Sequence, residues 1–96
     1  MDFHSGKLLK QIKVGNCWLK GISLLNNEYL FVASGDNNIK LLNLKTGIVI
    51  QDIPGHNSYV LTVKIIIHPK YGHCLISQGA YHGPIKLWAI SNQLIK

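Results

Sequence analysis

The chain has 96 residues, a length that holds one small domain. Apolar residues make up 47% of it, which excludes a disordered tail because such a chain can bury a core. The formal net charge is +6, from ten lysines, no arginine and four acidic residues. This charge predicts a general attraction to acidic surfaces. It does not predict specific nucleic-acid binding, because arginine is the residue that makes forked contacts to phosphate and guanine.

Short apolar runs separated by Gly, Asn and Pro predict strands along the whole chain. The first, over about residues 7–12, is expected to be an outer strand that precedes the first complete sheet. The strands of that antiparallel sheet are expected over about residues 18–25, 29–34, 38–44 and 47–53. Strands of a second sheet are expected over about residues 59–67, 73–78 and 84–90, with its outer strand beginning at 93–96. No window has the capped 3.6-residue stripe of a helix.

Several motifs occur twice, in the same order. "IKLL" at residues 39–42 returns as "IKLW" at 85–88, and "FVAS" ending at Ser34 returns as "CLIS" ending at Ser77. "VGN" at 14–16 matches "PGH" at 54–56, and "SGKLLKQI" from Ser5 matches "TGIVIQDI" from Thr46. A period of about 40 to 46 residues with four short strands per copy is typical of propeller blades.

The order of these motifs resembles the WD-repeat (WD40-type) β-propeller family. The resemblance implies an all-β fold with two antiparallel four-stranded blades, forming a partial, open propeller. The whole chain would be one domain, with repeat one at about residues 7–44, repeat two at about 46–90 and the truncated start of a third at 91–96. It also implies a buried network of structural side chains, in which Trp88 donates to Ser77 and Ser77 approaches His56; its members would be Ser34, Asp36, His56, Ser77 and Trp88.

Neither copy carries the family's complete network. The first copy has Asn16 where the family has His and Leu42 where it has Trp, and the second has His82 where the turn Asp is expected. A partly satisfied buried network stabilises less than a complete one. Both blades are therefore expected to be less stable than those of a full repeat.

Other candidate sites have simpler explanations as turns and strands. The spacing of His68, His73, Cys74 and His82 fits no common zinc pattern. Ser77 and His82 have no acid near them in sequence, as a catalytic triad would need. "SGDNN" at 34–38 has too little charge for calcium and reads as a turn. We therefore expect no catalytic, cofactor or metal site and no enzyme activity.

Four residues are candidates for binding a partner. Trp18 and Tyr59 stand at equivalent starts of the innermost strands, and Tyr81 and His82 lie in the longer turn of the second copy. Aromatic side chains on such a rim make binding hot spots. The alternative, that Trp18 and Tyr59 simply pack between the two sheets, is left open by the sequence.

The WD-repeat resemblance implies a non-catalytic protein–protein interaction or scaffold module. One alternative is a truncated or degenerate copy without a binding role of its own. Another, ranked lower because the chain has no arginine to read phosphorylated motifs, is a substrate-recognition piece of a ubiquitin ligase.

The expected partners are other proteins, including a second copy of the chain or a longer WD-repeat protein on which it docks. Strand addition by residues 7–12 to the second sheet of another molecule would be one route to self-association. The first residues have no secretory signal, and the longest apolar run, "YVLTVKIII", contains Lys64 and is too short to span a membrane. Cys17 and Cys74 read as separate free thiols, so an intracellular location, cytoplasmic or nuclear, is predicted.

Overall fold

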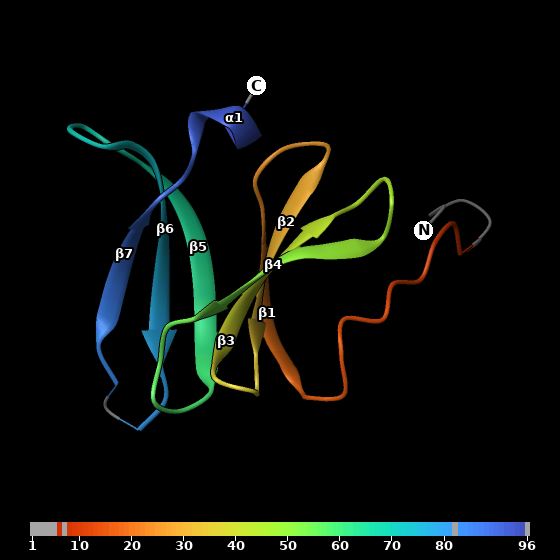
Figure 1. The fold of residues 1–96 in the computed structure, drawn as a ribbon, viewed down its shortest axis with the longest axis horizontal. Helices are drawn as coiled ribbons and strands as arrows, with labels where there is room; N and C mark the ends of the chain where they lie inside the picture. Colours follow the sequence, from red (N-terminus) through yellow and green to blue (C-terminus); the bar gives the residue numbers. More distant parts are fainter. Residues whose placement is uncertain (1–5, 7, 82, 96) are drawn as a thin grey trace.

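The computed structural model describes residue 6, residues 8–81 and residues 83–95 (Figure 1). The described residues form two antiparallel sheets of four and three strands and one short helix, so the all-β prediction is confirmed. In the first sheet each strand pairs with the next in sequence, and the strands are β1 (Leu19–Leu24), β2 (Tyr29–Ser34), β3 (Asn38–Asn43) and β4 (Ile48–Pro54). The second sheet follows the same rule with β5 (Val60–His68), β6 (Gly72–Gly79) and β7 (Ile85–Ala89).

Polar side chains close the tight turns between consecutive strands. The Asn26 side-chain oxygen accepts hydrogen bonds from two backbone N–H groups of the β1–β2 turn, and Asn43 does the same in the β3–β4 turn. In the β5–β6 turn, His68 Nδ1 is the acceptor for two backbone N–H groups. Asn37 and Gly72 adopt the left-handed backbone that turns require. Local side-chain bonds of this kind fix the strand ends.

The core lies where the two sheets pack face to face. Alternate residues of each strand point to this interface, and its buried side chains are Phe31, Ala33, Ile39, Leu41, Val60, Val63 and Leu75. The sheets are closest at β1 and β5, because a Cβ on Gly21 would lie 3.6 Å from the Leu61 carbonyl oxygen. Further out, a cavity of about 340 Å³ remains between them, lined by residues that include Phe31, Trp88 and Leu94.

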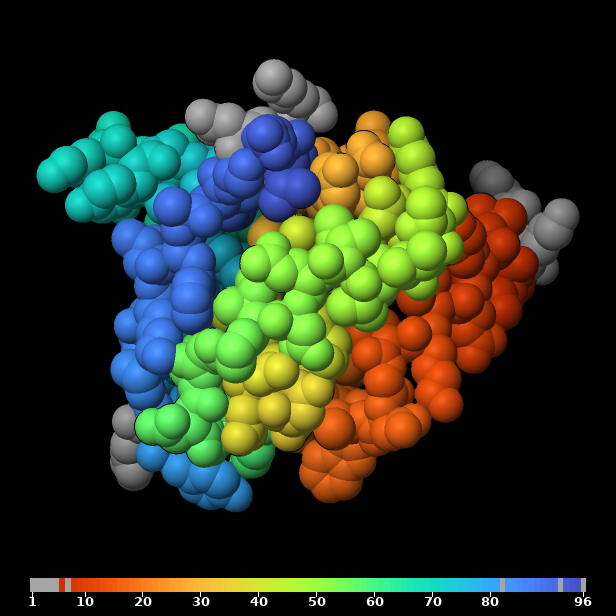
Figure 2. All heavy atoms as spheres, viewed as in Figure 1, coloured from red at the N-terminus to blue at the C-terminus, as the bar shows by residue number. Residues whose placement is uncertain are grey.

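Two of the predicted strands are wrong. Residues 8–12 form no strand, and residue 7 lies outside the described residues. They run instead along the side of the first sheet away from the second (Figures 1 and 2), where Lys10 Nζ donates to the carbonyl oxygens of Leu44 and Lys45 at 3.0 and 2.9 Å. An extended segment without a neighbouring strand edge cannot form a ladder.

Of the predicted outer strand at 93–96, residues 93–95 belong instead to a one-turn helix, α1 (Asn92–Ile95), and residue 96 lies outside the described residues. Ser91 begins it, since its Oγ accepts a hydrogen bond from Gln93 N–H and its carbonyl accepts one from Leu94 N–H. Leu94 packs on the core, and Asn26 Nδ2 donates to the Leu94 carbonyl at 2.7 Å. The helix therefore covers one end of the interface between the sheets. No helix within residues 6, 8–81 and 83–95 has the length and apolar character needed to cross a membrane.

The matched motifs keep their faces in both sheets, but not their register. In the first sheet Ala33 pairs with Ile39, whereas in the second Ile76, its counterpart, pairs with Leu87 rather than Ile85. The shift is two residues, and because side chains alternate with a period of two it leaves every residue on the same face. The longer turn of the second copy accommodates the difference.

Candidate binding site

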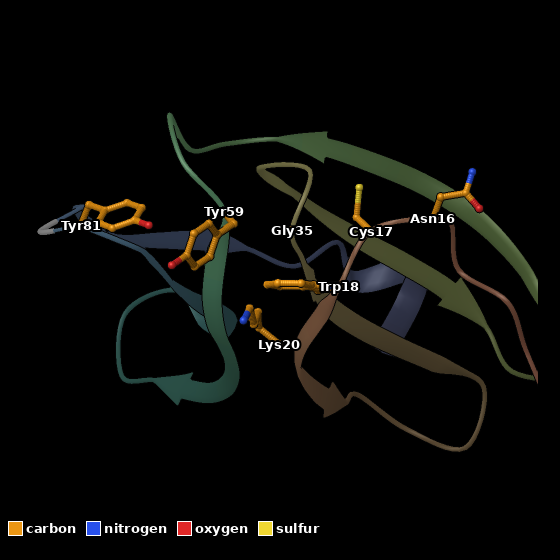
Figure 3. Close-up of a pocket in the computed structure, with 7 residues that line it drawn as sticks. All are labelled: Asn16, Cys17, Trp18, Lys20, Gly35, Tyr59 and Tyr81. Carbon is orange, nitrogen blue, oxygen red and sulfur yellow. The ribbon is translucent and has the colours of Figure 1, made fainter.

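A groove on the described surface crosses the ends of both sheets. It has a volume of about 440 Å³ and is lined by Asn16, Cys17, Trp18, Lys20, Gly35, Tyr59 and Tyr81 (Figure 3). One side of the groove comes from the segment before β1, from Lys20 in β1 and from Gly35 after β2. The other side comes from Tyr59 before β5 and Tyr81 after β6. Trp18 and Tyr81 are each 78% exposed, so Trp18 is not buried between the two sheets, whereas Tyr59 is half-buried.

Backbone hydrogen bonds hold Trp18 and Tyr59 in matching positions. The Trp18 carbonyl accepts a bond of 2.7 Å from Gly35 N–H, just beyond β2. The Tyr59 carbonyl accepts one of 3.0 Å from Ala80 N–H, just beyond β6. Each aromatic residue stands directly before a strand whose pairing is irregular at its first residues, in β1 and in β5. The two rings are therefore presented by equivalent, anchored backbone segments.

Lys20 lies between the rings that the two sheets contribute. Its Nζ is 5.0 Å from the centroid of the Trp18 ring and 5.4 Å from that of Tyr59, within the range of cation–π attraction (Figure 3). No carboxylate of the described residues forms a salt bridge with Lys20. The groove thus combines aromatic surface with one positive charge that has no anionic partner on the described part of the chain.

The two tyrosines pack edge to face. Their ring centroids are 5.5 Å apart at an angle of 76°, an arrangement that aromatic quadrupoles favour. Hydrogen bonding to Tyr81 raises the pKa of the Tyr59 phenol, with burial and the neighbouring phenol charge adding to it. Tyr59 therefore stays neutral at physiological pH, and no phenolate from it neutralises Lys20.

Three of the four candidate binding residues meet at this groove: Trp18, Tyr59 and Tyr81. His82 lies outside the described residues. Lys20 was not among the predicted binding residues, although a signal was present: it stands two residues after Trp18 at the start of a strand, so both side chains leave the same face. Asn16, the departure from the repeat pattern, lines the groove as well, and it was not predicted to do so.

A second set of side chains forms a hydrogen-bonded chain between the two sheets. The Trp88 indole N–H donates to Ser77 Oγ at 2.8 Å, and Ser77 Oγ lies 2.8 Å from His56 Nε2. Gly55 makes room for the ring, because a Cβ there would come within 2.7 Å of a Trp88 carbon. Ser77 is fully buried, so its hydroxyl has no access to a substrate in this conformation. This chain fastens β7 to β6 and to the segment that enters β5.

His56 is incompletely satisfied. Its Nδ1 is buried without a hydrogen-bond partner among the described residues, and a Cβ on Gly79 would lie 2.8 Å from it. Burial lowers the pKa of the His56 imidazole, and the positive charge of Lys86 lowers it further. The ring is therefore held neutral, and protonation works against the folded state.

The corresponding region of the first sheet uses charges in place of an indole. Lys40 Nζ lies 2.8 Å from an Asp36 oxygen and 2.9 Å from an Asp52 oxygen. Burial raises the pKa of Asp36, but hydrogen bonds from Lys40, Ser34 and the Asn38 backbone outweigh it and lower the pKa overall. Hydrogen bonding to Asp36 raises the pKa of Lys40 despite burial. Asp36 therefore forms an ion-paired cluster with Lys40 and Asp52, and Ser34 takes part in it through hydrogen bonding to Asp36.

Within the described ranges, no three side chains of His, Cys, Asp and Glu come together as metal ligands would. Cys74 is buried and Cys17 is exposed, and both are free thiols. No family model matches the chain.

Proposed function

We propose that the chain is a non-catalytic protein-interaction module that binds a segment of another protein in the groove of Trp18, Lys20, Tyr59 and Tyr81. The observation that carries the proposal is the position of Lys20 between Trp18 and Tyr59 in an otherwise uncharged groove. Exposed Trp and Tyr rings supply large contact area at a small entropic cost, which is why they dominate binding hot spots.

The partner segment should carry a carboxylate beside an apolar or aromatic side chain. The carboxylate would pair with the Lys20 ammonium, and the apolar side chain would pack on the rings. The net charge of +6 favours the approach of such a segment over that of a basic one.

We further propose that the two sheets are two blades of the WD-repeat type. The repeated motifs support this, as do the bonds that join Trp88, Ser77 and His56. On this proposal the module works inside the cell, as a scaffold, because the family it resembles does so. The degenerate-copy alternative differs from it in requiring no ligand at the groove.

The test is a selection of peptides displayed on phage with the folded chain as bait. We expect enriched sequences to combine an acidic residue with a neighbouring apolar or aromatic residue. Synthetic peptides of the enriched sequences should then bind the variants Trp18→Ala and Lys20→Ala more weakly than the parent chain. For Trp18→Ala we expect the dissociation constant to rise about 30-fold, which corresponds to the loss of about 2 kcal/mol of binding free energy at a hot spot.

A second lysine–aromatic pair provides the matched control. Lys70 Nζ lies 5.4 Å from the centroid of the exposed Tyr71 ring, in the β5–β6 turn outside the groove. Lys70→Ala and Tyr71→Ala should leave peptide binding unchanged. Selection of no peptides, or equal binding by the Trp18→Ala variant, would refute the groove as the binding site and favour the degenerate copy.

A further inference from the structure

A separate surface of the molecule, away from the groove, is the face of the second sheet that points away from the first. Along β7 the side chains alternate, so that Lys86 and Trp88 face the first sheet while Ile85, Leu87 and Ala89 face outward. Beside them is a hollow of about 350 Å³, lined by Tyr71, Cys74, Leu87 and Ala89. An apolar strand face that meets water is unusual unless another surface covers it.

The internal repeat shows what kind of surface fits there. Ile39 and Leu41 of the first sheet are the counterparts of Ile85 and Leu87, through the motifs "IKLL" and "IKLW". Ile39 is 0% exposed and Leu41 1%, because the second sheet covers them. Ile85 is 71% exposed and Leu87 46%. The same side chains at the same positions are thus buried in one sheet by a neighbouring sheet and left open in the other.

The covering surface also has a counterpart on the chain. In the core, Val63 and Ile65 of β5 pack against the first sheet. Trp18 and Tyr59 are equivalent, so the counterparts of Val63 and Ile65 are Ile22 and Leu24. Both lie in β1 on the face of the first sheet that points away from the second, and both are exposed. Residues 8–14 pass on this side near the β3–β4 turn (Figure 2). They leave Ile22 and Leu24 of β1 exposed.

We propose that a second copy of the chain covers the outer face of the second sheet with the β1 side of its own first sheet. The contact repeats the packing that joins the two sheets within one chain. It is heterologous, because it uses one surface of the first copy and a different surface of the next. Each added copy therefore offers a new free face, and assembly continues until a ring closes or a filament forms.

One difference between the copies limits how tightly they stack. Within the chain, β1 approaches β5 closely because it carries Gly21 and Ser23, and Ser23 Oγ accepts a hydrogen bond of 3.1 Å from Ile65 N–H. On the outer face of the second sheet the corresponding residues are Thr62 and Lys64, both exposed. The Lys64 side chain must bend to the rim for a second copy to approach. Lys64→Ser removes this obstacle and should therefore lower the dissociation constant of self-association by about 10-fold, which corresponds to about 1.4 kcal/mol.

The main test uses three variants with the same change of charge. Ile85→Asp places a carboxylate on the outer face of the second sheet, and Ile22→Asp places one on the opposing face of β1. Ile67→Asp is the matched control, because Ile67 is equally exposed but belongs to the other face of β5. All three positions are exposed in the single chain, so circular dichroism should show intact folds.

Light scattering after size-exclusion chromatography measures the outcome. We expect the parent chain and the Ile67→Asp variant to exceed the 10.7 kDa of one chain as concentration rises. Ile85→Asp and Ile22→Asp should each remain at the mass of one chain, with self-association weakened at least about 100-fold by a buried unpaired carboxylate.

Mixing the two assembly-deficient variants gives the decisive result. Each retains the surface that the other has lost, so an equimolar mixture should form a complex of twice the chain mass and no larger. A mixture that stays at one chain mass would overturn the proposal, because it would show that the contact is not heterologous. A parent chain that keeps the mass of one chain at about 1 mM would also overturn the proposal of self-association. Binding of a longer repeat protein to the same face would not rescue it.

Discussion

Removing the Ser77 hydroxyl tests the bonds that tie the second sheet together. Ser77→Ala takes away the acceptor of the Trp88 indole N–H and the partner of His56 Nε2, both at 2.8 Å. Ser77 is fully buried, but the indole and the imidazole are half-buried, so water replaces part of what is lost. An unsatisfied buried polar group costs about 1–3 kcal/mol, and we expect a loss of about 1–2 kcal/mol in the free energy of unfolding.

Urea unfolding followed by far-ultraviolet circular dichroism measures this loss. With a denaturant dependence of about 1.5 kcal/mol per molar, the midpoint should fall by about 1 M. The Trp88→Phe background isolates the indole bond, because Ser77→Ala should be less costly there than in the parent chain. A loss below about 0.5 kcal/mol at Ser77, the range of ordinary surface substitutions, or the same loss in both backgrounds, would refute the role of the hydroxyl.

The remaining predictions concern protonation, space and thiol access. Burial depresses the pKa of His56 below 6.5, so at low pH the unfolded chain binds a proton that the folded chain does not bind. The free energy of unfolding should therefore fall as pH drops below about 6.5. His56→Gln should reduce this pH dependence, measured by denaturant titrations at several pH values. Gly55→Ala would place a Cβ 2.7 Å from an indole carbon and should lower stability by about 1–3 kcal/mol, while Gly21→Ala, with contacts of 3.6 Å and more, should cost less in the same thermal unfolding assay. With Ellman's reagent, exposed Cys17 should react at once and buried Cys74 only after denaturation; fast reaction of both thiols would contradict the fold of β6.

The sequence predicted the central strands well because each carries its own local signals. The bounds of β2 match the prediction of residues 29–34, since Asn26 closes the turn before it and Gly35 follows it. Alternating apolar residues also indicated which side chains of β3 face the core. The aromatic positions of the groove followed from the repeat, because equivalent positions in two copies come to lie at the same end of the fold.

The two ends of the chain could not be predicted in the same way. A strand needs a partner edge, and the motif matches at residues 7–12 and 93–96 carry no information about whether such an edge is free. At Ser91 a local helix-starting hydroxyl decided the outcome, and the sequence did contain that signal. The two-residue shift between β6 and β7 was also beyond reach, because it keeps the pattern of faces unchanged.

The pairing of every strand with its neighbour in sequence also bears on how the chain folds. Every ladder joins strands linked by a short loop, so forming either sheet requires only short loops to close and no pairing with the other sheet. What couples them is the packing of Phe31 and Leu41 against Val63 and Leu75, together with the bond from Ile65 N–H to Ser23. The sheets are therefore two units of local stability, and this interface determines whether they unfold in one cooperative transition or in two.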